Sequence, residues 1–299
     1  MQTDHLPPLL AIIGPTAVGK TAYAIELAQR YNGEIVSADS RQVYKGMEIG
    51  TAQPSPAELA AVPHHLFGFL QPDDEFSLGT YVRLAKAAIA DITRRGKLPI
   101  LVGGTGQYVA AILDGWQVPE VAPHPELRAE LEAQAAAEGH QALYDRLLAV
   151  DPVAAEKIAP TNLRRVIRAL EVYLVTGQPI SQLQRREPPP YRMQTRWIVR
   201  EREELYERID RRVDQMMQAG LLDEVRALLE AGYGWQLSAM SSLGYIQFRP
   251  YFEGQADLES CVTRLKYDTH AFARRQDTWF RRLPYLVQIP ADQLTYDAW

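Results

Sequence analysis

The feature that most constrains the fold is a glycine-bounded loop near the start of the chain. An apolar run leads into it and a helical pattern follows it, and its spacing matches G-x-x-x-x-G-K-[ST]. Its residues are Gly14, Pro15, Thr16, Ala17, Val18, Gly19, Lys20 and Thr21. Such a loop curls backbone N–H groups around phosphate oxygens at a helix N-terminus. We expect Lys20 to reach the terminal phosphates and Thr21 to bind Mg²⁺. The alternative is a glycine-rich turn without a ligand.

Three apolar runs alternate with helical patterns in the first part of the chain. The runs cover residues 9–13, 34–38 and 98–102, and the helical patterns cover residues 20–31 and 78–95. This β-α-β alternation predicts an α/β fold, in which helices flank a parallel sheet. Ligands of such sheets bind at the carboxyl ends of the strands, so the loop lies where a ligand is expected.

A change in amino-acid composition predicts an inserted, all-helical domain. From residue 119 to about 186 the chain is rich in Ala, Leu and Glu at helical spacing, and three prolines follow at 188–190 as a stiff connector. We therefore predict a core in two parts, residues 1–118 and 188–299, around a helical insert at 119–187. Within the second part we expect strands at 196–200 and 285–289, and helices at 203–219, 221–231 and 258–282.

Charge and cysteine content narrow the classes of protein to which the chain can belong. A net charge of −5 is not that of a general nucleic-acid binder, but basic residues gather locally, at 164–168 and 264–282. Solvated helix faces are the alternative for either run. The single cysteine, Cys261, permits no internal disulfide, and the run at 9–13 is too short to span a membrane. We expect a cytoplasmic protein that binds no membrane.

Asp39 is the best candidate for a catalytic carboxylate. It ends the apolar run 34–38, whereas the run 98–102 ends in Gly103-Gly104-Thr105-Gly106 without an acid. The chain has no N-K-x-D motif for purine recognition. Asp39 could instead bind Mg²⁺ or cap a helix, and Thr105 could belong to a simple tight turn. For His64-His65 we favour a loop over a metal site, and for Trp279 and Phe280 core packing over base stacking.

Several stretches, taken in order, resemble the tRNA dimethylallyltransferase (IPP transferase) family. They are the loop at 14–21 and the segments 37–54, 101–108, 164–172, 244–245 and 273–280, so that the resemblance covers almost the whole chain. It implies a nucleoside-kinase-like P-loop core of the shorter bacterial type. It also implies transfer of a dimethylallyl group from dimethylallyl diphosphate to N6 of the adenosine immediately 3′ of the tRNA anticodon.

The resemblance assigns roles to individual residues. Gly14 to Thr21 bind the diphosphate, with Mg²⁺ on Thr21, while Asp39 acts as the general base and Thr105 lies at the reaction channel. The residues implied to contact tRNA are Asp39, Ser40, Arg41, Gln42, Thr105, Arg128, Asn162, Leu163, Arg164, Arg165, Val166, Gly244 and Tyr245. Arg208 and Arg212, one helical turn apart, are placed over the diphosphate, with solvated surface arginines as the alternative.

Two departures from the family pattern concern RNA contacts. Ile246-Gln247 replaces the common Lys-Glu pair, and Thr161-Asn162 replaces Asn-Asp. The competing functions are an adenylate isopentenyltransferase that uses free nucleotides, an ATP-dependent small-molecule kinase and a nucleotide-switch module. The helical insert favours tRNA, because a mononucleotide needs no such clamp. We expect a monomer whose partners are tRNA and dimethylallyl diphosphate.

Overall fold

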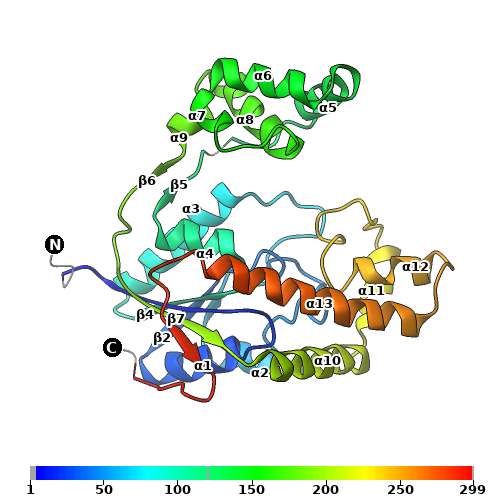
Figure 1. Cartoon of the computed structure of the whole chain (residues 1–299). Coiled ribbons are helices and arrows are strands. Elements are labelled where there is room, and N and C mark those ends of the chain that lie inside the picture. The colour runs from blue at the N-terminus through cyan, green and yellow to red at the C-terminus, as the bar shows by residue number, and fades with distance from the viewer. Residues whose placement is uncertain (1–4, 120, 298–299) are drawn as a thin grey trace. The chain divides into compact units, whose positions relative to one another are not determined.

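A six-stranded parallel sheet forms the centre of the larger part of the chain (Figure 1). The structure is a computed structural model and describes residues 5–119 and 121–297. The strand order is β3-β2-β4-β1-β7-β8. The strands are β1 (Pro8–Ile13), β2 (Gly33–Ser37), β3 (His64–His65), β4 (Leu98–Gly103), β7 (Arg192–Val199) and β8 (Gln288–Pro290). The predicted fold class, a parallel P-loop sheet flanked by helices, is confirmed.

The described chain divides into two compact units. The first, the core unit, contains residues 5–75, 84–110 and 190–297, and the second, the helical unit, contains residues 76–83 and 111–189 apart from residue 120. The helical unit thus begins earlier than residue 119 and takes in the start of α3 (Leu78–Arg94). Residues 1–4, 120 and 298–299, which the predicted domain ranges include, lie outside the described residues.

The helices of the core unit come from distant parts of the sequence. The N-terminal ones are α1 (Lys20–Arg30), α2 (Pro56–Ala61) and α4 (Gly106–Leu113), which runs into the helical unit. The C-terminal ones are α10 (Arg202–Gln218), α11 (Leu221–Glu230), α12 (Arg249–Phe252) and α13 (Leu258–Phe280), with a 3₁₀ turn at Ile246–Phe248. Helices α10 and α13 pack against each other. None of the described helices is long and apolar enough to cross a membrane.

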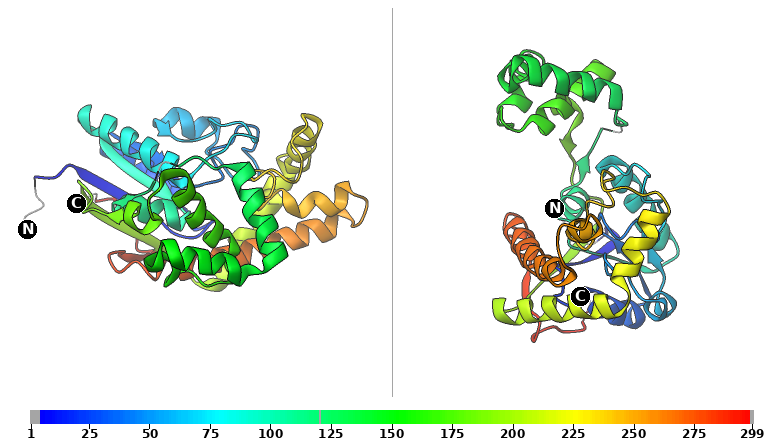
Figure 2. Two further views of the ribbon diagram at one scale, coloured as in Figure 1. Left: turned by 90° about the horizontal axis from the view of Figure 1, so that it is seen from above. Right: turned by 90° about the vertical axis from the view of Figure 1, so that its right-hand side faces the viewer.

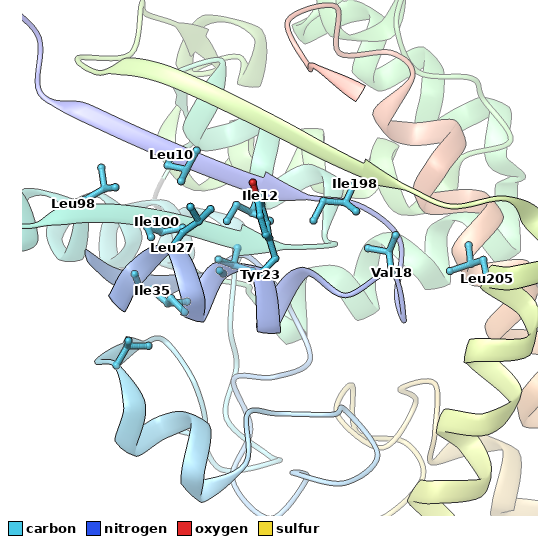
Figure 3. Close-up of a cluster of buried hydrophobic side chains, with 14 of the residues drawn as sticks. Leu10, Ile12, Val18, Tyr23, Leu27, Ile35, Leu98, Ile100, Ile198 and Leu205 are labelled. Carbon is cyan, nitrogen blue, oxygen red and sulfur yellow. The ribbon is translucent and has the colours of Figure 1, made fainter. Parts of the chain in front are cut away.

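The hydrophobic core lies between the sheet and α1. Leu10 and Ile12 of β1 and Ile100 of β4 meet Tyr23 and Leu27 of α1 (Figure 3). All five side chains are buried, and strands β1 and β4 are apolar along nearly their whole length because helices cover the sheet. Burying one such aliphatic side chain contributes about 1.5–3 kcal/mol. The core therefore holds the carboxyl ends of β1 and β4 in register, with Ile13 opposite Gly103.

The helical unit has its own core. Its elements are β5 (Trp116–Gln117), α5 (Pro125–Glu138), α6 (His140–Val150), α7 (Pro152–Ala155), α8 (Leu163–Thr176), α9 (Ile180–Leu183) and β6 (Arg185–Arg186). Leu131, Leu143 and Leu170 are buried together, and Figure 2 shows the helices as one cluster. Strands β5 and β6 pair antiparallel within this unit and form a two-stranded ribbon before the first and after the last of these helices.

The C-terminal part of the core unit differs in detail from the prediction. Strand β7 begins at Arg192 and not at residue 196, because Arg192 N–H already donates to the Pro7 carbonyl (2.9 Å) directly after the proline run. Strand β8 is confined to residues 288–290, and α13 ends at Phe280. The three prolines lie at the junction of the two units, since the helical unit ends at Pro189.

Candidate active site

The phosphate-binding loop joins the end of β1 to the start of α1. Gly14 and Gly19 have positive φ angles of 151° and 106°, which favour glycine. A Cβ at Gly14 would lie only 2.6 Å from the Ile198 carbonyl oxygen, so that no other residue lets the loop pass so close to β7. The loop therefore has the curled backbone that exposes N–H groups to an anion.

One cavity of about 670 Å³ in the core unit brings most of the predicted site residues together. Its size suits a diphosphate with an attached small group. Among the predicted residues, those that line it are Thr16, Lys20, Thr21, Asp39, Ser40, Arg41, Gln42, Thr105 and Arg212. Apolar side chains such as Ile35, Phe67 and Val102 complete the walls, so that the cavity combines cationic and hydrophobic surfaces.

Lys20 lies inside this cavity and its ammonium group donates to the Pro15 carbonyl (2.7 Å). The pKa of Lys20 is lowered to about 7, chiefly by burial, with Asp39 opposing the shift and the nearby Arg212 adding to it. A lysine of this kind is about half-charged at neutral pH. A bound diphosphate would favour the charged form, because its negative charge offsets the desolvation.

We therefore expect a diphosphate ligand to bind with uptake of a proton by Lys20. Since the free pKa is about 7 and the bound pKa is higher, uptake occurs above pH 7 and affinity falls as the pH rises. Calorimetry at pH 8 in buffers of different ionisation enthalpy measures the protons exchanged. The Lys20→Met variant should lose this uptake. Equal proton exchange by the two proteins would contradict the assignment.

Asp39 follows β2 and points into the same cavity. Its Oδ1 accepts a hydrogen bond from the Arg41 backbone N–H (2.9 Å), which orients the carboxylate. Among the described residues, Oδ2 accepts no hydrogen bond and is thus open to a ligand. Asp39 interacts electrostatically with both Lys20 and Arg212. A carboxylate so placed can accept a proton beside a bound diphosphate.

Thr105 braces the segment that carries Asp39. Its hydroxyl oxygen accepts from the Ser40 backbone N–H (2.9 Å), and its own N–H donates to the Ala38 carbonyl (3.0 Å). A Cβ at Gly103 would lie 2.2 Å from that carbonyl oxygen, so only glycine permits this approach. Thr105 and Asp39, which are 66 residues apart in the sequence (105 − 39), are therefore held on adjacent loops.

The two arginines of α10 lie in different environments. Arg208 donates from Nε to the Ala17 carbonyl of the phosphate-binding loop (2.9 Å). Arg212 lines the cavity, and within the described chain its guanidinium makes no hydrogen bond or ion pair. Burial lowers the pKa of Arg212, with Asp39 opposing the shift. Arg208 thus holds the loop, whereas Arg212 offers five N–H donors to whatever enters the cavity.

Arg41 and Gln42 face the cavity but are also bound to neighbouring loops. Arg41 donates to the Ser238 carbonyl (2.7 Å), and Gln42 donates to the carbonyls of Thr51 (3.2 Å) and Ala52 (2.7 Å). These bonds orient the loop that follows Asp39. Some of the hydrogen-bond donors of each side chain are consequently occupied by partners within the protein.

Tyr245, one of the predicted RNA contacts, lies inside the protein. Its side chain is fully buried, and its hydroxyl donates to Glu224 (2.7 Å), which also accepts from the backbone N–H groups of Ile49 (2.8 Å) and Gly50 (2.9 Å). A Cβ at Gly244 would lie 2.8 Å from the Gly50 carbonyl oxygen. This pair therefore supports the Gly50 loop of the cavity wall and presents no side chain to RNA. The sequence carried no signal for Glu224, since an acid on an amphipathic helix resembles a surface residue.

The predicted RNA-binding residues of the helical unit are of two kinds. Arg164 and Arg165 are exposed in the first turn of α8, where the Asn162 side chain accepts from the Arg165 N–H (3.4 Å) as N-cap. Val166, in contrast, is fully buried, and the partly buried Leu163 packs against the same core. The exposed side chains among these predicted RNA contacts are those of the two arginines and Asn162.

Arg128 also lies in the helical unit and is tied to a buried acid. Its guanidinium donates from Nε (2.7 Å) and Nη2 (2.9 Å) to Glu171, which Arg168 also contacts. Glu171 is fully buried, and these hydrogen bonds, with one from the His124 N–H, lower its pKa against the opposing effect of burial. Arg128 therefore contributes to the core of the unit as well as to its charge.

The remaining candidates have structural partners. His65 pairs with Glu34 (2.7 Å), His64 bonds the Val62 carbonyl (2.8 Å), and no cluster of metal-ligand residues occurs in the part of the chain that is described. Both histidines form the short strand β3 and not a loop. Phe280 is fully buried in the core, whereas Trp279 is half-buried and also lines the cavity.

Fold and cavity together define a P-loop α/β protein whose phosphate-binding loop faces a carboxylate across one pocket. A family model described as IPP transferase matches residues 42–283, and one described as isopentenyl transferase matches residues 7–65. The first match covers most of the chain. The chain therefore belongs to the IPP transferase family.

Curated relatives and solved structures agree with this assignment. The chain is 65% identical to a tRNA dimethylallyltransferase of Roseiflexus castenholzii over 95% of this chain and 93% of the relative. It is 64% identical to that of Chloroflexus aurantiacus over 93% and 94%. A tRNA isopentenylpyrophosphate transferase of Bacillus halodurans shares the fold with a TM-score of 0.70 at 42% identity, over 95% and 90% of the chains. A eukaryotic dimethylallyltransferase described as acting on tRNA gives 0.82 at 30% identity, over 95% and 74%.

Proposed function

We propose that the protein is a tRNA dimethylallyltransferase that moves a dimethylallyl group from dimethylallyl diphosphate to N6 of the adenosine beside the tRNA anticodon. The observation that carries this proposal is the cavity in which Lys20 and Asp39 interact. One side of that cavity suits a diphosphate and the other suits a proton donor. Family membership supplies the substrates that fit these two requirements.

Diphosphate is the leaving group of the proposed reaction. As the carbon–oxygen bond breaks, negative charge grows on the diphosphate oxygens. The curled loop N–H groups, Lys20 and Arg212 face this position and stabilise the charge more than they stabilise the intact substrate. Arg208 contributes by holding the Ala17 carbonyl and with it the loop conformation.

Asp39 accepts the proton of the nucleophile. An adenine amino group is a weak nucleophile, because its lone pair is delocalised into the ring. A carboxylate within hydrogen-bond reach removes the N6 proton as the new N–C bond forms. The Arg41 N–H orients Asp39, and Thr105 holds the neighbouring Ser40, so that the carboxylate needs no reorganisation during the reaction.

The residues present suit one Mg²⁺ ion bound together with the diphosphate. Mg²⁺ in such sites takes one or two protein ligands, with waters and phosphate oxygens completing its octahedron. Thr21, on the cavity wall in the first turn of α1, offers the hydroxyl that the P-loop pattern requires. The ion would neutralise charge on the diphosphate.

A stacked anticodon-loop base must leave the stack to reach a cavity of this kind. The exposed Arg164 and Arg165 at the start of α8 suit contacts with RNA phosphates, and we assign the helical unit to the anticodon stem and loop. Ser40, Arg41, Gln42 and Thr105 are assigned to the flipped nucleotide from the cavity wall.

Incubation with unmodified tRNA and labelled dimethylallyl diphosphate, followed by nucleoside analysis, tests the function. We expect the label in N6-modified adenosine of tRNA. Label on free AMP in place of tRNA would indicate the adenylate enzyme. A thermal shift that is larger with ATP than with dimethylallyl diphosphate would indicate a kinase or switch. Size-exclusion chromatography with light scattering checks the expected monomer.

A further inference from the structure

Gln276 of α13 connects two loops of the cavity. Its Oε1 accepts from the Thr16 backbone N–H (2.9 Å), and its Nε2 donates to the Gly104 carbonyl (2.9 Å). The side chain is buried, with 6% of its surface exposed. Because one partner is a donor and the other an acceptor, the side chain must offer both an acceptor and a donor, which the glutamine amide does in this single orientation.

The two partners belong to loops that leave neighbouring strands. Thr16 lies in the phosphate-binding loop after β1, and Gly104 lies in the loop after β4, which leads to Thr105. In the sheet, β1 and β4 are paired up to Ile13 and Gly103, and beyond this point no strand pairing holds the loops together. Gln276 bridges them where the ladder stops.

The packing around Gln276 shows that the space is built for its amide. A Cβ at Gly104 would lie 2.3 Å from Gln276 Nε2, and a Cβ at Gly106 would lie 2.4 Å from the ring of Trp279. Gln276 and Trp279 lie three residues apart on one face of α13. These two side chains therefore pack closely against the glycines on either side of Thr105.

We propose that Gln276 is a positioning residue that sets the distance between the bound diphosphate and the general base; this rests on the function proposed above. One bond acts on the loop that holds the leaving group. The other acts through Gly104 and Thr105 on Ser40, which is adjacent to Asp39. Reacting atoms must lie about 3–3.5 Å apart, and a misplacement of about 1 Å can cost about 10²-fold in rate.

Two substitutions separate this role from simple packing. Gln276→Leu removes both bonds, and we expect kcat to fall about 10²-fold with a much smaller change in KM for dimethylallyl diphosphate. In Gln276→Glu, an ionised carboxylate accepts from Thr16 N–H but repels the Gly104 carbonyl. A protonated carboxyl group restores both bonds, since its O–H can donate to Gly104.

The ratio of kcat for Gln276→Glu to kcat for the wild type should therefore rise as the pH falls from 8 to 6. Dividing by the wild type removes the titration of Lys20. Thr278→Ala is the matched control, because Thr278 is exposed on the same helix and bonds only the Arg274 carbonyl of its own helix (2.9 Å). Its ratio should stay near one at every pH.

Hydrogen exchange at the Thr16 amide gives a readout independent of turnover. We expect faster exchange in Gln276→Leu than in the wild type or Thr278→Ala. A folded Gln276→Leu with wild-type kcat and unchanged Thr16 exchange would overturn the proposal, as would a pH-independent ratio for Gln276→Glu. If Gln276→Leu does not fold, the Gln276→Glu series still decides. A wild-type protein that labels no tRNA would instead refute the proposed function.

Discussion

Replacing Asp39 with asparagine is expected to slow prenyl transfer by about 10²–10⁴-fold, the usual contribution of a general base. The amide retains an oxygen that can accept from the Arg41 N–H, so the loop should keep its conformation. It cannot accept the N6 proton. Binding of dimethylallyl diphosphate should stay nearly unchanged, because the diphosphate contacts lie on the opposite loop. Single-turnover transfer to tRNA and calorimetry measure the two effects.

The matched control for this substitution is Asp73→Asn, which changes the same functional group at an exposed position. It should transfer the prenyl group at the wild-type rate. A normal single-turnover rate in Asp39→Asn would eliminate Asp39 as the base. A large loss of diphosphate affinity in that variant would instead indicate that Asp39 acts through the metal ion.

The second large effect is expected at Arg212. Its guanidinium faces the cavity without a protein partner among the described residues, so its charge is available to the leaving diphosphate. Removing a donor that acts on developing charge typically costs about 10²–10³-fold in kcat. We expect Arg212→Ala to show a loss of this size in single-turnover kinetics. Arg212→Lys should recover part of it, since the charge remains but the fork geometry is lost.

Two neighbours on α10 serve as comparisons for Arg212. Arg211 is exposed, and Arg211→Ala should transfer the prenyl group at the wild-type rate in single-turnover kinetics. Arg208→Ala should act mainly on binding, because Arg208 holds the Ala17 carbonyl of the loop. If Arg211→Ala and Arg212→Ala slowed transfer equally, the effect would be one of general surface charge and not of a placed cation.

Local patterns were sufficient to predict the elements around the phosphate-binding loop. The loop sequence dictates its own backbone, and the alternation of apolar runs with helical spacing dictates a parallel sheet, whose strand ends bring Asp39 and Lys20 to one edge. The order of the strands in the sheet could not be predicted from the sequence, because β1 pairs with β7, which lies in the second part of the core. Pairing over that separation leaves no periodic signal.

Supporting residues escaped prediction for a related reason. Gln276 and Glu224 each bind backbone groups more than 170 residues away, and a buried backbone partner cannot be read from either residue's own neighbourhood. The burial of Tyr245 and Val166 was equally hidden from the sequence. Their motifs resemble family segments implied to contact RNA, but an aromatic or β-branched residue in such a motif can equally face the core, as both do.

The late position of β7, α10 and α13 in the chain has a consequence for synthesis. A ribosome releases the phosphate-binding loop first, but the strand beside it and the helices that carry Arg208 and Gln276 emerge only after the helical unit. An interrupted chain would thus contain the loop without the neighbours that hold it in place. The site can be completed only after these late elements have been made, and we expect incomplete chains neither to bind nor to hydrolyse the prenyl donor.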